Sequence, residues 1–106
     1  MSDQKPSPEA HPLAGLREQL DAIDVTLVET LARRLQLCGE IALRKREHNI
    51  PMMQQGRVEF VKQRCAEMGA ARGLDPDFVR RLYTLIIDEA CRLEDLLIDE
   101  GREQPK

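Results

Sequence analysis

The sequence predicts an all-α protein of one domain. Apolar residues recur every three or four positions along most of the chain, and no segment alternates as a half-buried strand would. A length of 106 residues suits one domain and not two. We therefore expect three helices, one long and two shorter, with no internal repeat.

The first helix is expected to be the longest and to begin at Leu13. No proline interrupts it before Pro51, and Gly39 alone costs only about 1 kcal/mol relative to alanine. Because the residue before a proline is pushed out of the helical conformation, we expect the helix to end near Glu47 or His48. Its apolar stripe, with the steps of an amphipathic helix, is Leu13, Leu16, Leu20, Ile23, Leu27, Leu31, Leu35 and Cys38, then Ile41 or Ala42.

Two further helices follow. The second is expected from about Gln54 to Arg72, and Gly73 provides a natural C-terminal cap. The third is expected to begin with Asp75 as N-cap and Pro76 in the first position, and to end before Gly101. Residues 1–12 hold three of the six prolines, so we expect a disordered tail there and another at 101–106, which leaves 13–100 as the helical domain.

Composition excludes several classes of function. A net charge of −3 and three aromatic residues argue against a nucleic-acid partner. No apolar run approaches the length of a membrane helix, so no membrane partner is expected. Three scattered cysteines indicate reduced thiols in a cytoplasmic protein, and two histidines do not make a metal site.

The length of the first helix predicts a homodimer. About 35 helical residues span roughly 50 Å, whereas a compact monomer of this size has a radius of gyration near 13 Å. The apolar stripe would therefore stay exposed unless a second chain covered it. We expect an intertwined homodimer.

Three basic residues of this helix suggest a ligand site. Lys45 lies eleven positions after Arg34, which returns it to within about 20° of the same helix face, roughly 16 Å along the axis. Arg17 is about 25 Å from Arg34, so it would reach such a site only in a partner chain. Since the chain has 16 basic residues, this spacing alone leaves ordinary solvated charges as an alternative.

The ordered motifs resemble the all-α (type II) chorismate mutase family over about residues 13–98. The motifs that carry the resemblance are Leu16-Arg17-Glu18, Ala22-Ile23-Asp24, Leu31-Ala32-Arg33-Arg34, Ile41-Ala42, Lys45, Pro51, Arg57, Gly73-Leu74-Asp75, Leu82 and Ile86-Ile87. The family implies an intertwined dimer with two sites, a small dicarboxylate substrate and a pericyclic [3,3] rearrangement that needs no metal or cofactor.

The resemblance also implies roles for single residues. Arg17 corresponds to the arginine that crosses to the other protomer's site, and Arg34 to the one that binds a substrate carboxylate. Lys45 corresponds to the lysine that donates to the ether oxygen, and Arg57 to a further substrate-binding arginine. Glu94 stands where members have a glutamine or a glutamate facing that oxygen, and it would help only if protonated.

Two positions depart from an ordinary chorismate mutase. Val58 replaces a glutamate that binds the C4 hydroxyl, and Gln54 replaces a common acidic residue. The segments 51–58 and 89–96 resemble most the branch that acts on 4-amino-4-deoxychorismate, which leads to p-aminophenylalanine for antibiotics. Ordinary chorismate mutase, isochorismate pyruvate lyase and a non-catalytic helical module that binds a protein partner remain alternatives, in that order.

Overall fold

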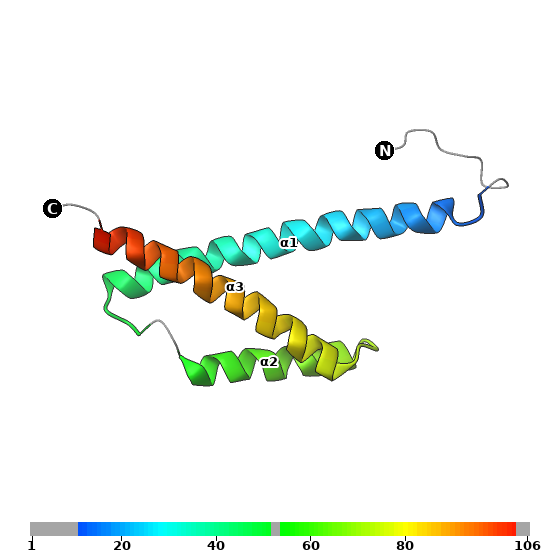
Figure 1. Ribbon diagram of the computed structural model, residues 1–106. Coiled ribbons are helices and arrows are strands. Elements are labelled where there is room, and N and C mark those ends of the chain that lie inside the picture. The colour runs from blue at the N-terminus through cyan, green and yellow to red at the C-terminus, as the bar shows by residue number, and fades with distance from the viewer. Residues whose placement is uncertain (1–10, 52–53, 104–106) are drawn as a thin grey trace. The chain divides into compact units, whose positions relative to one another are not determined.

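The computed structural model describes residues 11–51 and 54–103, and over these residues the protein consists of three helices without a strand. They are α1 (Ala14–Glu47), α2 (Gln55–Ala70) and α3 (Pro76–Glu103), drawn in chain order from blue to red in Figure 1. The prediction of an all-α fold with one long and two shorter helices is confirmed. None of these helices is both long and apolar enough to cross a membrane. Of the tail predicted for residues 1–12, residues 1–10 lie outside the described residues.

The chain divides into two units, residues 1–34 and 35–106. The described part of the first unit is almost entirely helical, and its apolar stripe is exposed. Leu16, Leu20, Ile23 and Leu27 keep between 59% and 61% of their surface accessible, and Leu31 keeps 37%. These are the side chains that the heptad-like spacing predicted to need a covering surface.

The second unit contains the end of α1 together with α2 and α3. Asn49 ends α1, because it has a left-handed backbone with φ of 57°. The Ile50 N–H then donates to the Lys45 carbonyl over 2.8 Å, which satisfies an orphan carbonyl of the last turn. The predicted end near Glu47 is confirmed, and the residue that makes the turn lies two positions before Pro51.

A tight turn joins α2 to α3, and both of its predicted caps are confirmed. Gly73 has φ of 86°, and the Leu74 N–H donates to the Gly69 carbonyl over 2.9 Å. Asp75 caps α3 by accepting the Asp77 N–H on its Oδ1 atom over 3.0 Å. The turn takes the residues after Ala70, so α2 stops two residues before the predicted Arg72.

The predicted end of α3 before Gly101 is wrong, because the helix continues to Glu103. A single glycine inside a helix costs only about 1 kcal/mol, so Gly101 is a weak stop signal. Part of the tail predicted for 101–106 is therefore helical.

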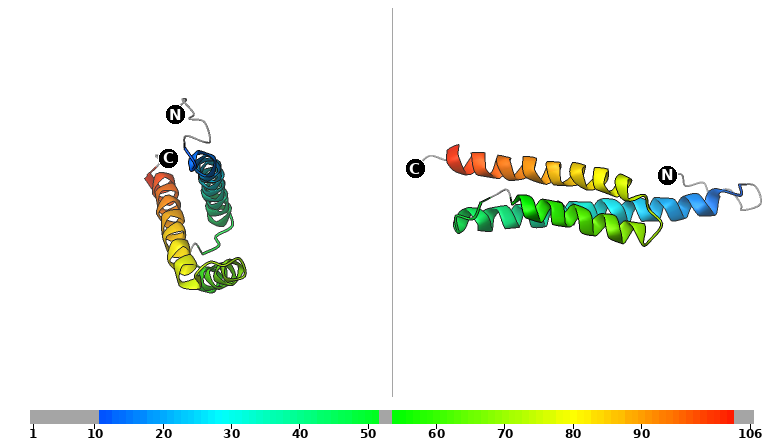
Figure 2. Two further views of the ribbon diagram at one scale, coloured as in Figure 1. Left: turned by 90° about the vertical axis from the view of Figure 1, so that its right-hand side faces the viewer. Right: turned by 90° about the horizontal axis from the view of Figure 1, so that it is seen from below.

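Helices α2 and α3 meet beside the turn that joins them (Figure 2) and enclose a cluster of the core. Val61, Cys65 and Val79 are buried there, and Tyr83 and Ile87 pack against them. Gly69 permits the closest approach, since a Cβ atom at this position would stand 2.7 Å from Val79 Cγ2.

The end of α1 contacts α3 around Leu97. Ala42 and Ala90 are the buried residues of this region, with 2% and 5% of their surfaces accessible. A Cβ atom on Gly39 would lie 3.8 Å from Leu97 Cδ1, so Gly39 faces α3. Arg46 Nη1 also donates to the Leu97 carbonyl over 3.0 Å. These contacts attach the last turns of α1 to the second half of α3.

The close contact at Gly69 gives a prediction for stability. Gly69→Ala should lower the free energy of unfolding by about 1 to 3 kcal/mol, since the new methyl group overlaps Val79 in a packed core. Gly56→Ala is the matched control, because its Cβ atom would meet nothing within 4 Å. Chemical denaturation of both variants measures the difference. Equal stability of the two variants would contradict the close packing.

Candidate active site

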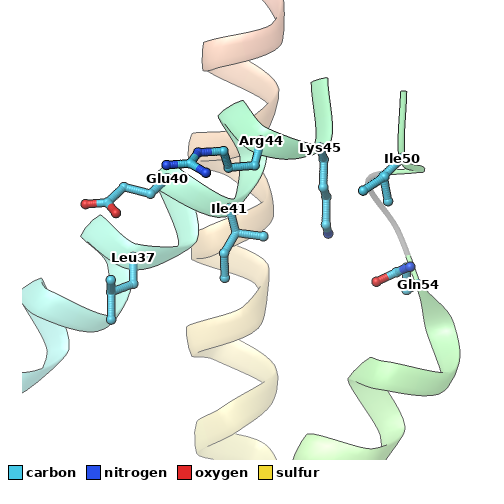
Figure 3. Close-up of a pocket in the computed structure, with 7 residues that line it drawn as sticks. All are labelled: Leu37, Glu40, Ile41, Arg44, Lys45, Ile50 and Gln54. Atoms are coloured by element: carbon cyan, nitrogen blue, oxygen red, sulfur yellow. The ribbon is translucent and has the colours of Figure 1, made fainter. Parts of the chain in front are cut away.

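Lys45, in the last turn of α1, stands at an open depression of about 510 Å³ in the second unit. Figure 3 shows the Lys45 and Gln54 side chains pointing toward the same space, whereas Arg44 and Glu40 extend away from Lys45. The remaining lining is apolar and comes from Leu37, Ile41 and Ile50. The Lys45 ammonium and the Gln54 amide therefore face the same space, which is otherwise lined mainly by apolar side chains.

One wall of the depression is a helix face and the other is a connection. Leu37, Ile41 and Lys45 follow at steps of four residues, so they line one face of α1. Ile50 and Gln54 come from the segment that follows the left-handed turn at Asn49. The turn reverses the chain, and this reversal brings the second wall opposite Lys45.

Glu94 on α3 interacts with Lys45 electrostatically. Burial raises the pKa of the half-buried Glu94 carboxyl, the Lys45 charge opposes this increase, and Asp95 adds to it. The net direction is upward, so the protein favours the neutral acid more than water does. A neutral carboxyl is a hydrogen-bond donor, whereas a carboxylate only accepts.

Cys91, one turn before Glu94, belongs to the same cluster. Burial raises the pKa of its thiol, the charges of Glu94, Asp88 and Asp95 add to the increase, and Lys45 opposes it. Cys91 belongs to the segment 89–96 that carries the resemblance but was not among the predicted site residues, and its position three residues before Glu94 puts both on one face of α3. The thiol contributes a neutral, half-buried surface beside the Lys45 and Glu94 pair.

Arg57 and Val58 lie in the first turn of α2. Both of their N–H groups donate to the Gln54 carbonyl, over 2.9 Å and 3.2 Å, so Gln54 begins the helix that carries them. Val58 is half-buried and Arg57 is exposed. The Arg57 guanidinium stands 5.4 Å from the ring centroid of Phe60, one turn further along. Arg57 therefore rests along α2, outside the lining of the depression around Lys45.

Arg17 and Arg34 belong to the first unit. Arg17 is exposed, near the start of α1, and Arg34 is half-buried. Of the seven residues predicted for the site, the structure thus groups Lys45 with Gln54 and Glu94 through a shared depression and a shared electrostatic interaction. The Lys45 ammonium and the Gln54 amide beside apolar side chains suit a small anion with an apolar carbon skeleton.

The Glu94 carboxyl gives a prediction for titration. Its pKa should lie above the usual glutamate value, and Lys45→Met should raise it further by removing the charge that opposes the shift. Side-chain carboxyl NMR measures both values. Because the folded chain binds this proton more tightly, the contribution to stability is present at low pH and is lost as pH rises through the folded pKa.

Glu89 on the same helix is the control for this titration. A hydrogen bond from Arg92 lowers the pKa of the Glu89 carboxyl, with Nε to Oε1 at 2.9 Å. Lys45→Met should leave the Glu89 value unchanged. A Glu94 pKa that does not respond to Lys45→Met would contradict the interaction between the two groups.

Comparison with known proteins identifies relatives of the whole helical region. The family model for chorismate mutase type II matches residues 16–95. A 4-amino-4-deoxychorismate mutase of Streptomyces venezuelae is 49% identical over 85% of this chain and 87% of the relative. Another protein of that name, from Streptomyces pristinaespiralis, is 44% identical over 91% and 74%.

A more distant relative is the bifunctional chorismate mutase/prephenate dehydratase of Escherichia coli. It is 30% identical over 85% of this chain, and the match covers 23% of that longer protein. The family match spans α1, α2 and most of α3, including Arg17, Lys45 and Glu94. The chain therefore belongs to the chorismate mutase type II family.

Proposed function

We propose that the protein converts 4-amino-4-deoxychorismate to 4-amino-4-deoxyprephenate by a [3,3] rearrangement. Two relatives of that name match most of this chain at 49% and 44% identity. The observation that supports the chemistry is the placement of Lys45 beside the depression and within electrostatic reach of Glu94. The proposed enzyme is a cytoplasmic isomerase that requires no cofactor.

The rearrangement breaks the ether C–O bond while a C–C bond forms, so negative charge grows on the ether oxygen. The Lys45 ammonium is the proposed donor to this oxygen. The protonated Glu94 carboxyl is the second donor, and the upward direction of its pKa supports that protonation state. Donors that are already in place are typically worth about 3 to 4 kcal/mol each in the transition state.

The remaining part of catalysis is conformational. The substrate carries two carboxylates on a flexible skeleton, and the rearrangement requires a chair-like conformer. We assign carboxylate binding to Arg34 and Arg57 of one chain and to Arg17 of its partner, because a guanidinium group binds a carboxylate through two parallel hydrogen bonds. The conformational entropy of the flexible substrate is lost on binding, before the reaction, so holding the reactive conformer lowers the barrier.

The proposed homodimer follows from the exposed stripe of the first unit. Leu16, Leu20, Ile23 and Leu27 are each more than half exposed. Fully burying a leucine or isoleucine side chain contributes about 1.5 to 3 kcal/mol, so covering these four residues would supply several kcal/mol of association. A second copy offers an identical stripe, and the same contact would carry Arg17 toward the partner's site.

Substrate selection is assigned to Gln54 and Val58. Val58 offers no acceptor to a C4 substituent, so a buried hydroxyl or amino group there needs an acceptor from another residue, and the lack of one costs about 1 to 3 kcal/mol. The Gln54 side chain points toward Lys45 in the depression, and its amide oxygen is an acceptor for an N–H group (Figure 3). Chorismate is the second candidate substrate, which the Escherichia coli relative favours.

The substrate prediction is a comparison of kcat/KM for 4-amino-4-deoxychorismate, chorismate and isochorismate. We expect the first to exceed chorismate by about tenfold or more, the equivalent of one missing hydrogen bond. Val58→Glu should move the ratio toward chorismate, and Val58→Leu, which adds no acceptor, should preserve it. Equal values for the amino and hydroxyl substrates would refute the selection, and no turnover of any of them would favour a non-catalytic binding module.

The shared-site prediction uses mixed dimers. Arg17→Ala and Lys45→Ala chains should each be nearly inactive alone. When they are unfolded together and refolded, half of the dimers are mixed, and each mixed dimer holds one intact site, so about a quarter of the activity should return. A mixture of Arg34→Ala and Lys45→Ala chains is the control. Each of these changes disables the site of the chain that carries it, so no mixed dimer contains an intact site. Failure of the first mixture to recover activity would contradict the exchange of Arg17.

A further inference from the structure

Arg46 follows Lys45 in α1 and reaches α3. Its Nη1 atom donates to the Leu97 carbonyl over 3.0 Å, and Leu97 lies three residues after Glu94. The hydrogen bond therefore connects the residue next to Lys45 with the turn that follows Glu94.

The same two segments also pack through uncharged residues. Gly39, Ala42 and Arg46 recur at steps of three and four, so they lie on one face of α1. Ala42 is buried, and a Cβ atom on Gly39 would meet Leu97 Cδ1 at 3.8 Å. Small residues at these positions offer little resistance to rotation or sliding of one helix on the other.

A directional contact removes that freedom. Consecutive residues point about 100° apart around a helix, so fixing the direction of Arg46 also fixes the direction of Lys45. The carbonyl that Arg46 binds belongs to the backbone of α3. The hydrogen bond therefore fixes the position of the helix itself and does not depend on a mobile side chain. Leu97 is seven residues after Ala90, and Glu94 lies between them on the same face.

We infer that Arg46 is a positioning residue that fixes the last turn of α1 against α3 and thereby holds Lys45 at the depression, within reach of the Glu94 charge. The inference rests on the proposed function for its effect on turnover, but the placement of Lys45 is measurable without substrate. Arg46 is not among the residues that line the depression, and its side chain binds the Leu97 carbonyl, so it acts through Lys45.

The substrate-free readout is the titration of Glu94. The charged or titratable groups that act on its carboxyl are Lys45 from α1 and Asp95 from α3, and Cys91 shares their field. Arg46→Met keeps the length of the side chain and removes the donor. If Lys45 then moves away, the Glu94 pKa should rise in the same direction as in Lys45→Met. Arg46→Lys, which keeps a donor and the charge, should restore part of the difference.

A double-mutant cycle separates positioning from a direct charge effect. In the Lys45→Met background, Arg46→Met should cause no further change in the Glu94 pKa, because the group through which it acts is absent. A further rise of equal size in that background would overturn the inference and assign the effect to the Arg46 charge. No rise in the single Arg46→Met variant would overturn it as well.

Turnover provides the second readout. Arg46→Met should lower kcat on 4-amino-4-deoxychorismate about tenfold or more while KM changes less. A small displacement of a catalytic donor weakens stabilisation of the transition state far more than it weakens substrate binding. Arg81→Met, which removes a charge from the exposed side of α3, should keep the kcat of the parent chain. A loss of kcat that merely follows a loss of folded protein, measured by circular dichroism, would overturn the inference. Failure of the parent chain to turn over the substrate would refute the proposed function alone, because the NMR titration still tests Arg46.

Discussion

The hydrogen bond from Arg46 of α1 to the Leu97 carbonyl of α3 links the helix that carries Lys45 to the helix that carries Glu94. Beside it, a Cβ atom on Gly39 would lie 3.8 Å from Leu97 Cδ1, and Ala42 is buried. A larger residue at Ala42 would disturb the part of α1 that carries Lys45 toward Glu94. The interaction between these two groups is therefore a product of packing and would not follow from either helix alone.

The electrostatics of the pair show two opposed effects on one carboxyl. Burial favours the neutral acid at Glu94, and the nearby ammonium group favours the anion. Burial is the larger effect here, so the Lys45 charge does not lower the pKa of Glu94 to its usual value. This balance differs from that of Glu89, whose exposed carboxyl accepts hydrogen bonds from Arg92 and stays more acidic than usual.

Most of the fold followed from local signals in the sequence. The periodicity of α1, the glycine at 73 and the Asp75-Pro76 pair each determine structure within a few residues, and the caps that they predicted are confirmed. The predicted end of α3 was wrong because a lone glycine is a weak stop signal for a helix. The left-handed conformation of Asn49 was not predicted, because asparagine adopts it only where the following chain requires a reversal.

The site was harder to predict from the residues because it depends on contacts between distant segments. Spacing placed Lys45 on a helix face, but it did not indicate that Glu94 and Cys91 lie within its electrostatic reach. The resemblance to a family supplied Gln54, Arg57 and Glu94 as candidates. Arg46 carried no signal at all, because its partner is a backbone carbonyl and any residue at position 97 would offer one.

The two walls of the depression have different mechanical origins. Leu37, Ile41 and Lys45 project from a helix, whose backbone hydrogen bonds keep their spacing constant. Ile50 and Gln54 come from a connecting segment, where substitutions and changes of length are tolerated far better. Natural variation in the connection would thus reshape one side of the cavity while the ammonium group on the other side stays in place. Such a division lets a lineage acquire new substrates without rebuilding the groups that perform the reaction.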